Sequence, residues 1–136
     1  MDVNPYLSFN GDCEEAFQVY ADLMGGELLS IYYFDQAAAV GAQPASDSRV
    51  MAARLRLGQN VLMGSDVAIG ETYARPVGIR LQTNINDVIE ARRIFDRLAV
   101  GGEVEMPFEQ TYWASGFGLC RDRFGVPWMI NCDRED

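Results

Sequence analysis

The sequence predicts an α+β fold in which one β-α-β-β-β module is used twice. The first observation is an internal repeat: residues 20–28 and 95–104 both end an apolar helix at a glycine pair, which a Glu and an apolar strand follow. Second, an apolar strand precedes each helix, and third, each copy closes with two more strands joined by a short turn. A repeat of about 75 residues constrains the order of elements along the whole chain.

The first module contains a helix whose N-terminal cap is expected at Asp12, with Glu15 three positions later as its partner in a capping box. Gly25 and Gly26 end this helix. Its apolar stripe, spaced by three and four positions, consists of Cys13, Ala16, Phe17, Tyr20, Ala21 and Met24. The strands expected in this module span residues 3–9, 27–34, 49–57 and 61–63.

The second module repeats this order. Its helix begins after Asn86 and ends at Gly101-Gly102. The side chains that this helix buries are Ala91, Ile94, Phe95 and Leu98. The strands expected here span residues 77–83, the segment after Glu103, 113–121 and 126–132.

Together the two modules form a single predicted domain over residues 1–136. The modules cover about residues 1–66 and 76–133, and residues 67–75 link them. Residues 35–48 are rich in Ala, Gly and Pro and lack periodicity, so they form either a lid over a site or an excursion without structure.

Composition excludes several kinds of chemistry. The chain has no histidine, its 11 basic residues are all arginine, and its formal net charge is −9. Catalytic triads with histidine, lysine Schiff bases and phosphate-binding P-loops are therefore excluded. Because the acidic excess repels phosphate backbones, we expect no nucleic-acid partner.

We expect a cytoplasmic protein that does not bind membranes. No apolar stretch of 18 residues occurs, and the N-terminal residues lack the pattern of a secretory signal. The three cysteines, Cys13, Cys120 and Cys132, show no C-x-x-C spacing and suit reduced thiols.

The strand over residues 50–57 presents two different faces. Met51, Ala53, Leu55 and Leu57 form the face expected to pack on the helix. The other face carries Val50, Ala52, Arg54 and Arg56 and lies either in solvent or in the concavity of a curved sheet. In a concavity, the two arginines would bind an anionic or carbonyl-bearing ligand.

Several segments together carry a family resemblance. They are Asn4-Pro5-Tyr6-Leu7, Cys13 to Phe17, Met24 to Glu27, Val61 to Asp66, Met106-Pro107-Phe108, Tyr112-Trp113 and Asp122 to Ile130. Over nearly its whole length the chain resembles the PhnB-like branch of the glyoxalase/bleomycin resistance/dioxygenase, or vicinal oxygen chelate, superfamily. The resemblance implies paired βαβββ modules, a curved mixed sheet around a cavity, and a homodimer.

Metal-dependent members of that superfamily hold a divalent ion with His, Glu or Gln side chains on four strands. The matching positions here fall near Pro5, Arg54, Gly78 and Met129, none of which offers an oxygen or imidazole ligand. We therefore expect no metal and no cofactor. A methyltransferase or phosphonate role finds no support either, because Gly101-Gly102 closes a helix instead of opening one.

The resulting hypothesis is metal-independent binding of a small molecule in the cavity between the modules, with the catalytic residues unknown. The expected pocket residues are Arg54, Arg56, Met63, Trp113, Phe117 and Met129. The aromatic residues would otherwise serve the core or a dimer seam. The alternative function is a metal-dependent lyase, isomerase or dioxygenase whose non-standard ligands come from Glu103, Glu105, Glu109 or Asp122. A third possibility is a domain that works through its surface.

Overall fold

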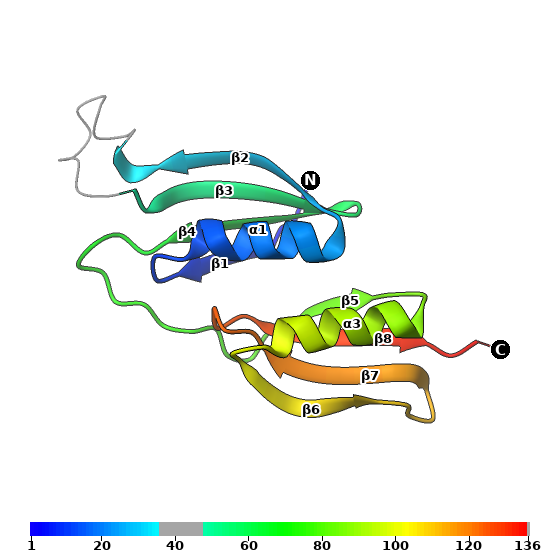
Figure 1. Cartoon of the computed structure of the whole chain (residues 1–136). Coiled ribbons are helices and arrows are strands. Elements are labelled where there is room, and N and C mark those ends of the chain that lie inside the picture. The colour runs from blue at the N-terminus through cyan, green and yellow to red at the C-terminus, as the bar shows by residue number, and fades with distance from the viewer. Residues whose placement is uncertain (36–47, 136) are drawn as a thin grey trace. The chain divides into compact units, whose positions relative to one another are not determined.

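A computed structural model describes residues 1–35 and 48–135 of the chain (Figure 1). It divides into two compact units, Met1–Ala74 and Arg75–Asp136. Unit 1 contains β1 (Tyr6–Phe9), α1 (Cys13–Met24), β2 (Glu27–Tyr33), β3 (Val50–Leu57) and β4 (Asn60–Asp66). Unit 2 contains β5 (Leu81–Asn84), α3 (Val88–Ala99), β6 (Glu103–Glu109), β7 (Ala114–Arg121) and β8 (Pro127–Asp133). The α+β class and the repeated β-α-β-β-β order are confirmed.

Unit 1 is a four-stranded mixed sheet in the order β1-β4-β3-β2, with β1 parallel to β4 and the other pairs antiparallel. α1 covers one face of this sheet (Figure 1). Phe17 and Tyr20 of the helix and Leu55 of β3 are fully buried there. Burying each such side chain contributes roughly 1.5–3 kcal/mol.

Unit 2 repeats the arrangement, with strand order β5-β8-β7-β6 and α3 on one face (Figure 1). The predicted helical stripe of Ala91, Ile94, Phe95 and Leu98 is buried. Gly118 of β7 lets the helix approach, because a Cβ at this position would lie 2.8 Å from the ring of Phe95. Trp128 of β8 is 1% exposed and belongs to this core.

The glycine pairs that revealed the repeat have a shared structural cause. The first glycine of each pair has a left-handed backbone, with φ of 70° at Gly25 and 75° at Gly101. The second approaches the end of a strand: a Cβ on Gly26 would lie 2.5 Å from the Arg56 carbonyl oxygen, and one on Gly102 would lie 2.0 Å from that of Arg121. No residue with a side chain fits at the second position without moving the backbone.

The capping box predicted at the start of α1 is wrong. Asp12 is the N-cap residue with φ −118° and ψ 23°, and among the described residues its side chain makes no capping hydrogen bond. An Oδ1 atom of Asp66, at the end of β4, instead accepts the amides of Gly11 at 2.9 Å and Cys13 at 3.0 Å. A carboxylate distant in sequence thus fixes the start of this helix.

The alternation predicted for residues 50–57 holds only from Ala52 onward. Tyr32 pairs with Ala52 and Tyr33 with Val50, so Met51 is an extra residue in β3. This bulge reverses the alternation: Val50 is 1% exposed and Met51 is 36% exposed. The expectation that Met51 packs on the helix and Val50 faces away is therefore wrong.

Two strands start later than predicted. β1 begins at Tyr6, after Pro5, which has no amide hydrogen to contribute to a ladder. β5 begins at Leu81 because Gly78 adopts φ 78°, outside the range of an extended strand. Neither described helix is long and apolar enough to cross a membrane. The predicted segment 35–48 lies outside the described residues, apart from Asp35 and Ser48 themselves.

Candidate functional site

In residues 1–35 and 48–135, each unit leaves one face of its sheet without a helix, and we call this its open face. Residues paired across neighbouring strands point to the same side of a sheet, so the register identifies the members of each face. On the open face of unit 1, one row crosses all four strands and consists of Tyr6, Met63, Arg54 and Ser30. Two predicted pocket residues, Arg54 and Met63, are thus direct neighbours.

The two arginines on this face differ in their partners. Arg56 pairs with Glu27 of β2, with 2.6 Å between Nη2 and Oε2, and both side chains are about half exposed. Arg54 lies in an interior strand, and no carboxylate of the described residues lies within ion-pair distance of its guanidinium. Within the described part of unit 1, Arg54 is therefore a cation on the open face that no carboxylate pairs with.

The open face of unit 2 carries apolar and amide side chains. One row, from β5 to β6, consists of Gln82, Met129, Leu119 and Met106, and the next consists of Asn84, Asn131, Phe117 and Glu109. The side-chain amide of Asn131 donates to Asn84 at 3.1 Å and to Asp133 at 2.8 Å. These bonds hold the amide against the sheet and leave the neighbouring apolar side chains to line the face.

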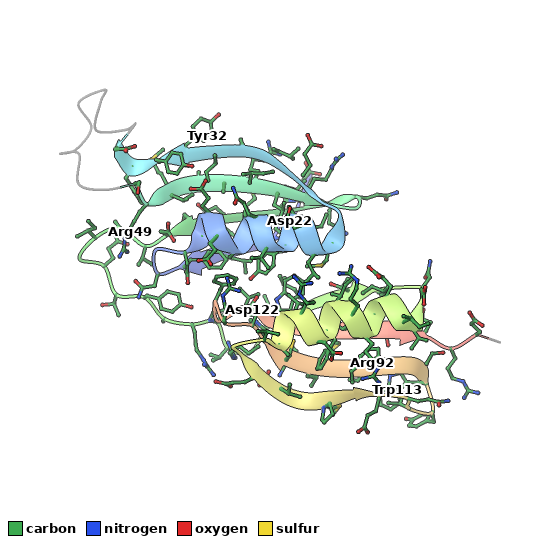
Figure 2. The ribbon with its side chains drawn as sticks, in the orientation of Figure 1. Asp22, Tyr32, Arg49, Arg92, Trp113 and Asp122 are labelled. Atoms are coloured by element: carbon green, nitrogen blue, oxygen red, sulfur yellow. The ribbon has the colours of Figure 1, made fainter. Side chains whose placement is uncertain are left out.

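An aromatic cluster lies at one end of this face, next to the turn between β6 and β7. The Trp113 ring lies edge-on to Phe117, with 5.4 Å between centroids, and 4.8 Å from the Tyr112 centroid. Trp113 is 48% exposed, so this cluster is accessible. Figure 2 shows Trp113 at one end of unit 2 and Asp122 at the other, with β7 running between them.

Charged side chains gather at the opposite end of the face. Arg75 pairs with Glu103 at 3.3 Å, and Arg80 pairs with Glu105 at 2.9 Å. The hydrogen bond from Arg80 lowers the pKa of the Glu105 carboxyl, and the charges of nearby arginines act in the same direction. Arg121 is 7% exposed and donates from Nη1 to the carbonyls of Pro76 at 2.8 Å and Gly125 at 2.7 Å.

The structure therefore sorts the predicted pocket residues into two groups. Arg54, Arg56 and Met63 share the open face of unit 1. The members in unit 2 are Trp113, Phe117 and Met129, of which the first two are in ring contact. That both groups line one cavity stays a prediction. Sequence reasoning missed Arg80 and Arg121, although the repeat matches Arg121 with Arg56 and could have drawn attention to it.

The positions at which the family resemblance implies metal ligands do not fit a divalent ion here. Pro5 offers only its carbonyl, which already accepts the Met63 amide at 2.9 Å. Arg54 carries a positive charge, and the glycine and the thioether at the other two positions offer no hard ligand. Over residues 1–35 and 48–135, no cluster of three or more His, Cys, Asp or Glu side chains could hold a metal.

The carboxylates considered as non-standard metal ligands are engaged elsewhere. Glu103 and Glu105 pair with arginines. Asp122 is buried, with Oδ1 accepting the amides of Phe124 and Val126 at 2.9 and 3.0 Å, and Oδ2 accepting the Trp128 indole N–H at 2.9 Å. Three of the four candidate ligands thus have protein partners, and the structure does not bring the set together.

The buried thiols are not nucleophiles at neutral pH. Burial raises the pKa of Cys120 to about 12 and raises that of Cys13 still further, with nearby carboxylates adding to both shifts. The thiolate is the reactive form, so both side chains act as small apolar groups of the core.

Known proteins similar to this chain share nearly its full length. Residues 1–131 match the family model described as 3-demethylubiquinone-9 3-methyltransferase. Protein YjdN of Escherichia coli (strain K12) is 36% identical over 140 residues, which cover 96% of this chain and 95% of YjdN.

Solved structures agree with this assignment. Protein PA1353 from Pseudomonas aeruginosa superposes with a TM-score of 0.86 at 39% identity, covering 99% of both chains. A PhnB protein from Bacillus cereus superposes with a TM-score of 0.84 at 24% identity, covering 97% of this chain and 99% of the other. A glyoxylase/bleomycin resistance protein/dioxygenase domain from Frankia sp. EAN1pec shares the fold, with a TM-score of 0.66 at 14% identity, covering 98% of both chains. This chain therefore belongs to the 3-demethylubiquinone-9 3-methyltransferase family and has the fold of a PhnB protein and of that domain.

Proposed function

We propose that this protein binds a small, partly aromatic or anionic molecule without a metal ion, through the open faces of its modules. The observation that carries the proposal is the lack of a suitable ligand side chain at the four positions where the family resemblance implies metal ligands. These positions fall near Pro5, Arg54, Gly78 and Met129. Arg54 in particular would repel a cation.

The side chains of the open faces support binding of an organic molecule. Aromatic walls with a small number of polar groups are typical of small-molecule sites. Trp113 and Phe117 supply such a wall in unit 2, and Arg54 supplies a cation without an ion-pair partner among the described residues of unit 1. None of the rows described on the two open faces places a nucleophile beside a general base, so the proposal is binding and includes no catalytic step.

Elemental analysis of the purified protein, combined with native mass spectrometry, tests this proposal. We expect less than about 0.1 equivalent of Zn, Ni, Mn or Fe per chain, since metal affinity requires deprotonated N, O or S ligands in place. We also expect a co-purifying small molecule in the native spectrum. A stoichiometric, tightly held transition metal would contradict the proposal.

A metal-dependent lyase, isomerase or dioxygenase is the second candidate, favoured only by the chemistry common in the superfamily. It would need Glu109 together with carboxylates that now pair with arginines or accept backbone amides. Activity assays with each divalent ion, using this protein and its Glu109→Gln variant, separate the two functions. Metal-dependent turnover that the variant loses would establish the second.

Assembly and location belong to the same proposal. We propose a homodimer, because large apolar side chains such as Tyr6, Tyr32 and Met106 are 43–54% exposed in the open faces or at their edges. We also propose a cytoplasmic protein, because all three cysteines are buried free thiols. Sedimentation that gives a 15.2 kDa species at micromolar concentration would contradict the homodimer.

A further inference from the structure

The two units place equivalent arginines in different electrostatic environments. Gly26 of unit 1 packs on the Arg56 carbonyl, and Gly102 of unit 2 packs on that of Arg121, so these arginines occupy matching places in the repeat. Each also stands opposite a glutamate in the register, Glu27 in unit 1 and Glu103 in unit 2. Arg56 forms an ion pair with its glutamate, whereas Glu103 pairs with Arg75 instead.

Arg121 is consequently a buried cation that forms no ion pair with a carboxylate of the described residues. Its Nη1 donates to two carbonyls, and its Nε is the one buried side-chain nitrogen or oxygen of the described residues that lacks a hydrogen-bond partner. Burying a charge without an ion pair is costly, because it loses hydration that neutral carbonyls replace only in part. An anion placed nearby would recover part of this free energy.

Arg121 points to the same side of β7 as Leu119 and Phe117, because side chains two residues apart share a face. Arg80 precedes β5, Glu105 lies in β6, and these are the two edge strands of the sheet. Their ion pair therefore spans β8 and β7 on the open face. Three arginines face two glutamates at this end, which leaves one excess positive charge.

The rest of the face is apolar. Leu119 pairs with Met129 in the middle, and Phe117 contacts Trp113 at the far end. Arg121 lies four positions after Phe117, which is about 13 Å along the strand at roughly 3.3 Å per residue. The open face of unit 2 thus has a cationic end and an apolar length that would accommodate a molecule of about 10–13 Å.

We propose that this face recognises an anionic amphiphile. Arg80 and Arg121 receive its oxyanion group, and Leu119, Met129, Phe117 and Trp113 receive its apolar body. The Glu105 carboxylate competes with the oxyanion of the ligand, because it already accepts a hydrogen bond from Arg80. This inference names the ligand class of the site in unit 2 and rests on the function proposed above.

Fluorescence titration with two matched probes tests the inference. 1-Anilinonaphthalene-8-sulfonate carries an oxyanion on an aromatic body, and N-phenyl-1-naphthylamine is the same body without the charge. Both are titrated into the full-length protein at fixed ionic strength. We expect Phe117→Ala to weaken the binding of both probes by about fivefold or more, because both lose the same apolar contact.

The charge variants should change the affinity for the sulfonate probe alone. We expect Arg80→Gln to weaken its binding about fivefold and Glu105→Gln to tighten it about threefold, while the uncharged probe changes less than twofold. Glu90→Gln and Arg93→Gln are the controls, because they change net charge equally in an ion pair on α3. Arg121→Gln should weaken the sulfonate most. If that variant fails to fold, the variants of the partly exposed Arg80 and Glu105 still decide the question.

Three results would overturn the inference, and they differ in what they say about the proposed binding function. Equal effects of Glu105→Gln and Glu90→Gln on the sulfonate, with both probes bound, would overturn the anionic ligand class and leave the proposed binding function intact. Failure of both probes to bind would overturn this inference and count against the proposed pocket. Loss of the uncharged probe in the Arg80 variant would also overturn the inference, since a charge effect cannot explain it.

Discussion

Asp66 should be the carboxylate on which the stability of unit 1 depends most. Its side chain is 3% exposed and accepts three backbone amides: Oδ1 takes those of Gly11 and Cys13, and Oδ2 takes that of Val50 at 2.8 Å. These bonds tie β4 to the start of α1 and to the start of β3. Hydrogen bonds to a charged acceptor contribute about 1.5–3 kcal/mol each, and an orphaned buried donor costs about 1–3 kcal/mol.

Asp66→Ala should therefore lower the free energy of unfolding by about 4.5 kcal/mol, which is the lower end of the range for three hydrogen bonds to a charged acceptor. With a urea m-value of about 2 kcal/mol/M, the midpoint falls by about 2 M. Asp12→Ala is the matched control, because the sequence pattern assigns the cap to Asp12 and the structure assigns it to Asp66. We expect that control to cost less than about 1 kcal/mol.

Urea titrations followed by far-UV circular dichroism measure both variants, and Asp66→Asn should fall between Asp66→Ala and the parent protein. A loss below 1 kcal/mol for Asp66→Ala would refute the assignment of the cap. So would a larger loss for Asp12→Ala than for Asp66→Ala.

Three further outcomes are expected. Gly26→Ala should lower the free energy of unfolding by about 3 kcal/mol, because a Cβ at Gly26 meets backbone atoms. Gly25→Ala should lower it by only about 1 kcal/mol, because a Cβ there meets nothing within 4 Å. Equal losses of the two variants in thermal melts would contradict this. Burial raises the pKa of the Asp12 carboxyl above 3.8, so the folded state binds this proton more tightly than the unfolded state. The folded state therefore loses stability as the pH rises through the raised pKa. Asp12→Asn should stabilise the protein at pH 7, and this gain should vanish below pH 3.8. All three thiols should resist a disulfide reagent until urea unfolds the chain, and fast labelling of native Cys120 would contradict its burial.

The repeated module could be predicted because its signals are local. The glycine pairs mark the ends of both helices, and the apolar periodicity of residues 91–98 identifies the buried side of α3. Each depends on a few neighbouring residues. Family membership could likewise be predicted, since its motifs are spread along the whole chain.

What could not be predicted depends on strand pairing. The cap from Asp66 joins residues 53 positions apart, and the bulge at Met51 exists only in the register of β2 with β3. Prediction of the site was limited in the same way. Trp113 and Phe117 are close in sequence and were expected together. That Arg121 is left without an ion pair depends instead on Glu103 pairing with Arg75, 28 positions earlier.

The most direct test of a metal-free binding site is to measure ligand binding with and without metal. 1-Anilinonaphthalene-8-sulfonate is titrated into the protein after exhaustive chelation and again after incubation with Zn, Mn, Ni or Fe. Because arginines and aromatic side chains supply the proposed contacts, the dissociation constant should agree within about twofold in every sample. Binding that chelation abolishes and one of these ions restores would contradict the account.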